Sequence, residues 1–274
     1  MTLEHQQTAI ASTPLPRSRK VPPWVGAVAT PVLSGVGGIL LWELIVQLRD
    51  IPPYLLPAPS LVFTEIVDNW ARLMRQLGFT AFASLVGFAA ALVLGIGLGA
   101  LFTTSRVVER IVYPWLVIFH AIPKVVIAPL FLVWIGFGMK SETIFVIIFT
   151  IFPILVNTVT GLKAADPELL QLARSMGATR ASALWKIRVP AAMPTIMAGV
   201  KISATMAPVG AVIGEFVASN VGLGHLLIQA VGSLETPLAF AAVVVISVFM
   251  FIWAVLVPGK QRRESASGFV QPAE

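Results

Sequence analysis

The sequence contains little charge: 12% of its 274 residues are Asp, Glu, Lys or Arg, and 57% are hydrophobic. A soluble domain usually contains about 25% charged residues, so this chain has about half the charged surface that a water-soluble domain of its length carries. The apolar residues form long continuous runs, which favours membrane helices over the short alternating segments of a β-barrel. We therefore expect an all-α, polytopic protein embedded in the lipid bilayer.

The sequence also lacks the residues of common catalytic sites. Cysteine is absent, which excludes disulfides, thiolate nucleophiles and cysteine metal sites. No GxxxxGK[ST] phosphate loop occurs, since the GFGMK stretch at residues 136–140 has neither its spacing nor its Thr. HExxH, GxSxG and paired-carboxylate sites are missing as well. We expect no catalytic residue, no metal and no cofactor in this chain.

Six apolar segments predict six membrane-spanning helices. They cover residues 24–48, 77–102, a stretch from residue 111 that prolines interrupt, 143–162, 195–218 and 237–257. The prediction is a single membrane domain over residues 24–258, between polar tails at 1–23 and 259–274. Gly95, Gly97 and Gly99 are expected to let helices pack closely. A short amphipathic helix is expected from residue 61 to 77, and a tight turn is expected at Lys140 and Glu142.

The basic residues lie in the short connections between apolar segments, which argues against a nucleic-acid partner despite the net charge of +6. With six spans, both termini and the second and fourth connections share one side, which holds 13 Lys or Arg residues against four on the other. Because cytoplasmic loops carry the excess of positive charge, both termini and the loop at residues 163–190 are expected in the cytoplasm.

This loop is the most polar interval between two long apolar segments. Asp166 is placed to cap a helix, Pro167 suits its first position, and Gly177 can end it in a left-handed conformation. One face of this helix is apolar at helical spacing, formed by Leu169, Leu172, Ala173 and Met176.

A second short helix is expected from Thr179 to Lys186, and Pro190 and Pro194 are expected to close the unit before the next span. The result is a helix-turn-helix outside the membrane. Its apolar face either lies on the membrane surface or binds a partner.

The stretch QLARSMGATRASALWKIRVP at residues 171–190 resembles the EAA signature of ATP-binding cassette importer permeases. That signature reads Glu-Ala-Ala, three residues, Gly, nine residues, Ile, one residue, Leu-Pro. The matching positions are Ala173, Gly177, Ile187 and Pro190, and the departures are Gln171, Leu172 and Val189. Residues 40–60 and 128–138 resemble the nitrate/taurine/alkanesulfonate group of these permeases. Residues 152–170 resemble members assigned to pyrimidine vitamin precursors, riboflavin or aromatic acids.

The resemblance implies a type I importer permease in a bacterial inner membrane, with both termini inside. The helix after Asp166 would be the coupling helix that docks on a P-loop ATPase subunit. Its contact residues would be Glu168, Leu169, Leu172, Ala173, Arg174, Met176, Gly177, Ala178 and Arg180. The implied complex contains two ATPase subunits that bind ATP and Mg, a second permease subunit, in a homodimer or a heterodimer, and a periplasmic or lipid-anchored substrate-binding protein. This chain would perform no bond chemistry, whereas the assembled complex would be an import ATPase.

Ionisable residues within the apolar segments are candidates for the transport pathway, because a charge at the bilayer centre costs about 2.5–3.5 kcal/mol on insertion scales. The candidates are His120, Lys124 and Glu215. Lys124 and Glu215 either form an ion pair or contact the solute, and both roles stay open. A pathway lined by His120 and Lys124 suits a small anionic or heteroaromatic solute.

The competing interpretation is a secondary transporter or channel that works without an ATPase. It predicts internal repeats or proton-relay carboxylates at the midplane. The sequence shows no convincing repeat, and only Glu43 and Glu215 are placed to serve as such carboxylates.

Overall fold

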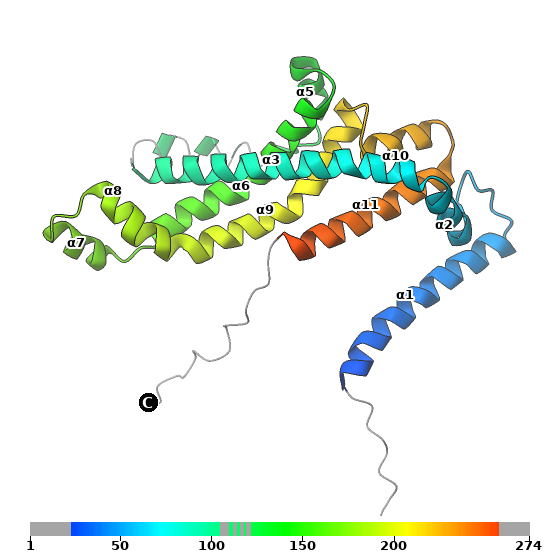
Figure 1. The fold of residues 1–274 in the computed structure, drawn as a ribbon, viewed down its shortest axis with the longest axis horizontal. Coiled ribbons are helices and arrows are strands. Elements are labelled where there is room, and N and C mark those ends of the chain that lie inside the picture. Colours follow the sequence, from blue (N-terminus) through cyan, green and yellow to red (C-terminus); the bar gives the residue numbers. More distant parts are fainter. Residues whose placement is uncertain (1–22, 105–109, 112–113, 116–117, 119–121, 258–274) are drawn as a thin grey trace, which may run out of the picture. The chain divides into compact units, whose positions relative to one another are not determined.

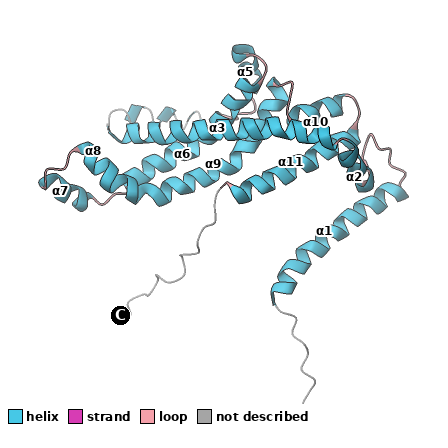
Figure 2. Cartoon of the chain, in the orientation of Figure 1, coloured by secondary structure: helices cyan, strands magenta, loops and turns pink. Residues whose placement is uncertain are grey.

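The computed structural model describes residues 23–104, 110–111, 114–115, 118 and 122–257. Every regular element in these ranges is a helix and none is a strand (Figure 2), which confirms the all-α fold. The chain forms two compact units, residues 1–50 and 51–274. The predicted tails fall almost entirely outside the described residues, as do His120 and six other residues of the stretch predicted as the third span.

The first unit contains helix α1, Pro23–Leu48, which agrees with the first predicted span. The large apolar side chains along its second half are exposed, as befits a helix in contact with lipid, and Val46 is buried. Two polar residues of α1 bind each other: the Gln47 amide donates a 2.6 Å hydrogen bond to the Glu43 carboxyl. Pairing one turn apart on a helix removes two polar groups from an otherwise apolar surface.

The second unit begins with helix α2, Pro59–Asp68, and helix α3, Trp70–Thr104. The amphipathic helix predicted over residues 61–77 was therefore wrong in its extent. The chain breaks at Asn69, whose side chain donates to Glu65 at 2.7 Å, and residues 70–77 are the first turns of α3. Because Leu73 is completely buried within this unit, these turns belong to the packed part of α3.

The core lies where α3 packs on helices α6, Met139–Lys163, and α9, Val189–Ala218 (Figure 1). Gly95 and Gly99 of α3 face α6 so closely that a Cβ at either position would lie 2.8 and 2.7 Å from Ile154 and Thr158. The predicted packing role is confirmed for these two glycines, whereas Gly97 faces open space. Backbones can approach this closely only where side chains are missing.

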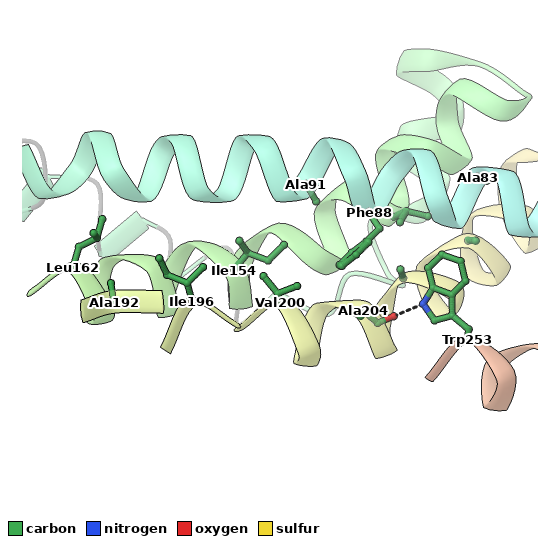
Figure 3. Packing of buried hydrophobic residues seen from close by; sticks show 13 residues of the cluster. Ala83, Phe88, Ala91, Ile154, Leu162, Ala192, Ile196, Val200, Ala204 and Trp253 are labelled. Carbon is green, nitrogen blue, oxygen red and sulfur yellow. Dashed lines mark hydrogen bonds between the residues drawn. The ribbon is translucent and has the colours of Figure 1, made fainter. Parts of the chain in front are cut away.

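Helix α11, Thr236–Leu256, closes the second unit against α9. The indole Nε1 of Trp253 donates a 2.7 Å hydrogen bond to the Ala204 carbonyl at the edge of the buried apolar cluster (Figure 3). Two shorter helices also belong to this unit, α5 at Ala128–Ile135 and α10 at Leu223–Gly232.

Four helices within the described ranges are long and apolar enough to cross a membrane: residues 70–103, 139–163, 181–218 and 236–256. They match the second, fourth, fifth and sixth predicted spans. The count of six stays a prediction, because the third span is described with gaps at 112–113, 116–117 and 119–121, and the apolar stretch at 32–48 of α1 is shorter than a span. The turn before α6 differs from the expected one. It is formed by Gly136 and Gly138, both with positive φ, and Glu142 already lies in the first turn of the helix.

Candidate functional site

Helix α7, Pro167–Ser175, forms the predicted helix of the polar loop, which starts where α6 ends at Lys163. The Asp166 carboxylate accepts a 2.8 Å hydrogen bond from the Glu168 amide and so caps the helix, with Pro167 in its first turn. Glu168 near the start and Arg174 near the end have the charges that complement the helix dipole. The predicted start of this helix is confirmed.

The end of α7 is set by Gly177. Its φ of +83° lies in the left-handed region, and a Cβ there would meet no atom within 4 Å. The amides of Gly177 and Ala178 donate at 2.9 Å to the carbonyls of Arg174 and Ala173, so the last carbonyls of the helix are satisfied. This arrangement is the left-handed cap that the sequence predicted.

The apolar face of α7 has no partner in the described part of the chain. Leu169, Leu172 and Met176 are 48%, 57% and 78% exposed, while Ala173 is half-buried. Three exposed apolar side chains spaced over two turns form a compact patch, which marks an interaction surface in a folded protein. Ala178 is also half-buried, and the backbone of Arg180 begins the next helix.

The second helix of the loop does not end at the prolines, contrary to expectation. Helix α8, Arg180–Ala183, continues as a π-helix, η1 at Leu184–Arg188, and then as α9 without a break. The Val189 amide donates to the Leu184 carbonyl, five residues back. The wider π turn precedes Pro190, which falls in the first turn of α9, and Pro194 lies inside that helix. The loop is therefore joined rigidly to the span that follows it.

A second polar cluster lies at the other end of α9, where α10 begins (Figure 1). Three successive amides of α10 donate to side chains of α3 and α9: Gly222 to Gln76 at 2.7 Å, Leu223 to Thr80 at 3.0 Å, and Gly224 to Glu215 at 2.7 Å. Side chains from two other helices thus cap α10. This end of the unit is fastened by hydrogen bonds between elements.

Glu215 is 1% exposed and Glu142 of α6 is completely buried. Glu142 lies close by, since a Cβ at Gly214 would come within 3.1 Å of its Cα. Both Glu142 oxygens and Oε1 of Glu215 have no hydrogen-bond partner. Ser219 neighbours the Glu142 carboxyl, but the one proton of its hydroxyl is donated to the Val221 carbonyl at 2.7 Å.

Sequence reasoning found Glu215 but missed Glu142, Gln76 and Thr80. Glu142 was assigned to a turn, although Gly136 and Gly138 are the residues suited to that turn. These two glycines were the available signal, because a turn placed at them puts Glu142 inside the following helix. Gln76 and Thr80 carried no local signal, because their role depends on α10, more than 140 residues further along the chain.

The predicted pathway residues are not brought together in the described part. The Lys124 ammonium lies 5.7 Å from the centroid of the Phe149 ring, in cation–π range. Glu215 accepts from the Gly224 amide, and no ion pair between Lys124 and Glu215 occurs among the described residues. His120 lies outside those residues.

The long apolar helices and the exposed amphipathic helix α7 define a polytopic membrane protein with a polar loop between two of its spans. Comparison with known proteins identifies the family within this class. A family model described as "Binding-protein-dependent transport system inner membrane component" matches residues 91–263, more than half of the chain.

Relatives match over most of their length. The riboflavin transport system permease protein RibX of Chloroflexus aurantiacus is 34% identical over 258 residues, covering 92% of this chain and 94% of that one. The formylaminopyrimidine transport permease protein ThiX of Halalkalibacterium halodurans is 33% identical over 218 residues, covering 79% and 87%. A solved structure of the MetNI methionine ABC transporter in an inward-facing conformation shares the fold, with a TM-score of 0.56 and 20% identity over 66% of this chain and 90% of that one.

The chain belongs to the family of binding-protein-dependent transport system inner membrane components. It is a permease subunit of the ATP-binding cassette importer type, as the resemblance in the polar loop implied. The comparisons give no support to a transporter or channel that works without a motor.

Proposed function

We propose that α7 is the surface through which an ATPase subunit drives this permease. The observation that carries the proposal is the exposed apolar patch of Leu169, Leu172 and Met176 on a helix capped at both ends. Leaving such a patch in water is unfavourable by about 25 cal/mol for each Å². A groove on a soluble partner removes it from water, and helix-in-groove recognition uses this spacing of anchors.

Charged residues lie next to the patch in the sequence and suit the rim of such a groove. Glu168 and Arg174 lie on α7 and are exposed, and Arg180 begins α8. Charge-assisted hydrogen bonds from arginines to acidic groups fix the orientation of a docked helix. Apolar burial would supply the affinity, while the rim charges would select the partner and its register.

The test is an Ala173→Asp variant, which places a carboxylate in the contact face. The matched control is Gln171→Asp, an equal change of charge on the opposite, exposed side of α7. We expect A173D to lose copurification with the ATPase and to lose transport, and Q171D to keep both. Normal copurification and transport by A173D would show that α7 is not the docking surface.

The assembly that fits this role contains two ATPase subunits, which bind ATP and Mg, and a second copy of this chain. A periplasmic or lipid-anchored binding protein would deliver the solute. The orientation that the positive charges favour puts both termini and α7 in the cytoplasm of a bacterial inner membrane. Closure of the ATPases on ATP would then move α7 and the spans joined to it, and hydrolysis would reset them.

The solute class we propose is small and anionic or heteroaromatic. Two relatives of similar length are named for riboflavin and for formylaminopyrimidine, and both names denote nitrogen heterocycles. Lys124 beside Phe149 offers a cation and an aromatic face, which together suit such a solute. Identification of the ligand that copurifies with the cognate binding protein tests this class directly. A compound that is neither anionic nor heteroaromatic would contradict it.

His120, Lys124 and Glu215 stay our candidates for the pathway or its gate. Glu215 lies in the cluster at the α10 end of the unit, so a gating role there would act by fastening or releasing α10. Lys124 precedes α5 and is half-buried, which leaves its ammonium accessible to a solute.

A further inference from the structure

The polar cluster at the start of α10 contains three buried oxygens that no donor satisfies. They are both carboxyl oxygens of Glu142 and Oε1 of Glu215. A buried polar atom without a hydrogen bond costs about 1–3 kcal/mol in mutational data, and folded proteins retain few of them. Three such atoms on two neighbouring side chains therefore need a ligand that the protein atoms do not provide.

No cation neutralises these carboxyls in the described part of the chain. Arg75 and Lys140 are exposed, and His225, which follows Gly224, is half-buried. None of these three forms an ion pair with Glu142 or Glu215. Arg72 of α3 is also exposed, and its guanidinium donates to the Gln229 side chain of α10 at 3.4 Å. Two buried carboxylates side by side cannot both be charged, because desolvation and mutual repulsion act in the same direction.

The surroundings distinguish the two acids. Glu215 accepts a hydrogen bond from the Gly224 amide at the N-terminus of α10, where the helix dipole favours negative charge. The Thr80 hydroxyl neighbours the same carboxyl, although its proton is donated to the Gln76 carbonyl at 3.3 Å. Glu142 receives no donor at all, since the Ser219 hydroxyl is bonded to the Val221 carbonyl. The charge therefore belongs on Glu215, and the neutral form belongs on Glu142.

We propose that Glu142 and Glu215 form a proton-binding site, in which the neutral acid of Glu142 donates its proton to the free Oε1 of Glu215. One proton, taken from solvent, satisfies an oxygen on each carboxyl and leaves a single buried charge next to the α10 amides. The bond joins the first turn of α6 to α9 and, through Gly224, to α10. The site thus fastens three helices at the end of the unit remote from α7.

Infrared spectroscopy of the purified subunit in an ester-free detergent tests the site directly, because neutral carboxyl groups absorb apart from carboxylates. At neutral pH the wild type should show a neutral carboxyl band. The band should vanish in Glu142→Gln, whose amide donates to Glu215 in place of the proton. It should persist at a shifted position in Glu215→Gln, since Glu142 stays neutral but changes its acceptor. Glu235→Gln, at an exposed position, is the control and should leave the band unchanged.

The dependence of unfolding on pH gives a second, independent reading. The folded pair holds a proton that the unfolded glutamates, with an ordinary pKa of about 4.3, release at neutral pH. The native state then binds more protons, so the ratio of unfolded to folded protein should rise with pH by up to about tenfold per pH unit. We expect the wild type and E235Q to lose stability relative to E142Q as pH rises above about 5.

Three results would overturn the proposal. One is a wild-type spectrum without a neutral carboxyl band, or with a band that E142Q does not remove. Another is a stability difference between the wild type and E142Q that does not change with pH. The third is stability that depends on sodium or potassium concentration at fixed pH, which would place a metal cation where we place the proton.

Discussion

Truncating the exposed apolar side chains of α7 should weaken ATPase binding in proportion to the surface that each one presents. Complete burial of a Leu or Met side chain contributes about 1.5–3 kcal/mol. Leu172 and Met176 are 57% and 78% exposed, so most of this contribution is still available to a partner. We expect L172A and M176A each to lose about 1–2 kcal/mol, which corresponds to about 5- to 30-fold weaker binding. A buried aspartate at position 172 should cost more, because its charge would have no partner.

The assay is a titration of purified ATPase subunit onto the permease in lipid nanodiscs. Q171A and S175A are the matched controls, because both residues are exposed on the other side of the same helix. Surface substitutions of this kind usually stay within about 0.5 kcal/mol, so they should bind within about twofold of wild type. Circular dichroism of each variant checks that the helical content is unchanged. If L172A and M176A bind as tightly as the controls, the patch is not the docking surface and the argument from exposure fails.

The remaining predictions concern the loop cap, the orientation and the pathway. Gly177→Val should destabilise the loop by about 1–2 kcal/mol and weaken ATPase binding, because it forces a β-branched residue into the left-handed region. Gly177→Asn should have a smaller effect on both. If the two variants have equal effects on thermal unfolding and on ATPase binding, this account of the cap is wrong. The chain has no cysteine, so single S175C and S233C variants should label from opposite sides of the membrane with an impermeant maleimide, with S233C reacting outside; external labelling of S175C would reverse the topology. Lys124→Ala should reduce uptake of the solute that the cognate binding protein carries, while exposed Lys140→Ala should not; unchanged uptake in K124A would remove Lys124 from the pathway.

The docking loop was predictable because its signals are local. Asp166, Pro167 and Gly177 act within a few residues of their own positions, through one side-chain cap, one fixed φ and one left-handed residue. The apolar spans were predictable for a similar reason, since each needs only length and composition. Such features do not depend on which other segment packs against them.

The continuity of the helix through Pro190 and Pro194 was not predictable from local rules. Proline lacks the amide that a helix interior needs, so a break was the natural expectation. The structure keeps the helix by a π turn before Pro190 and by packing of its first turns on α6, where a Cβ at Gly161 would lie 3.0 Å from the Ala192 carbonyl. Tertiary contact overrides local propensity here.

The cluster around Glu142 and Glu215 could not be predicted from the sequence for a different reason. Its groups come from α3, α6, α9 and α10, and only the folded chain brings them together. The two roles expected of Glu215 were an ion pair with Lys124 and contact with the solute. In the described residues its neighbours are backbone amides, a hydroxyl and a second acid, an arrangement that no spacing in the sequence indicates.

The unbroken helical run from Arg180 to Ala218 has a mechanical consequence. The 30 residues of α9 alone span about 45 Å, and glycines on both sides bring its backbone and that of α3 into near-direct contact with α6. Because this packing leaves little room between the helices, we expect them to move together as a lever arm, even though Pro194 and Pro208 lie inside α9. A tilt of about 5° imposed near α7 would sweep the opposite tip through about 4 Å, by the same geometry. A movement imposed at the α7 end would thus reach the α10 end as a displacement.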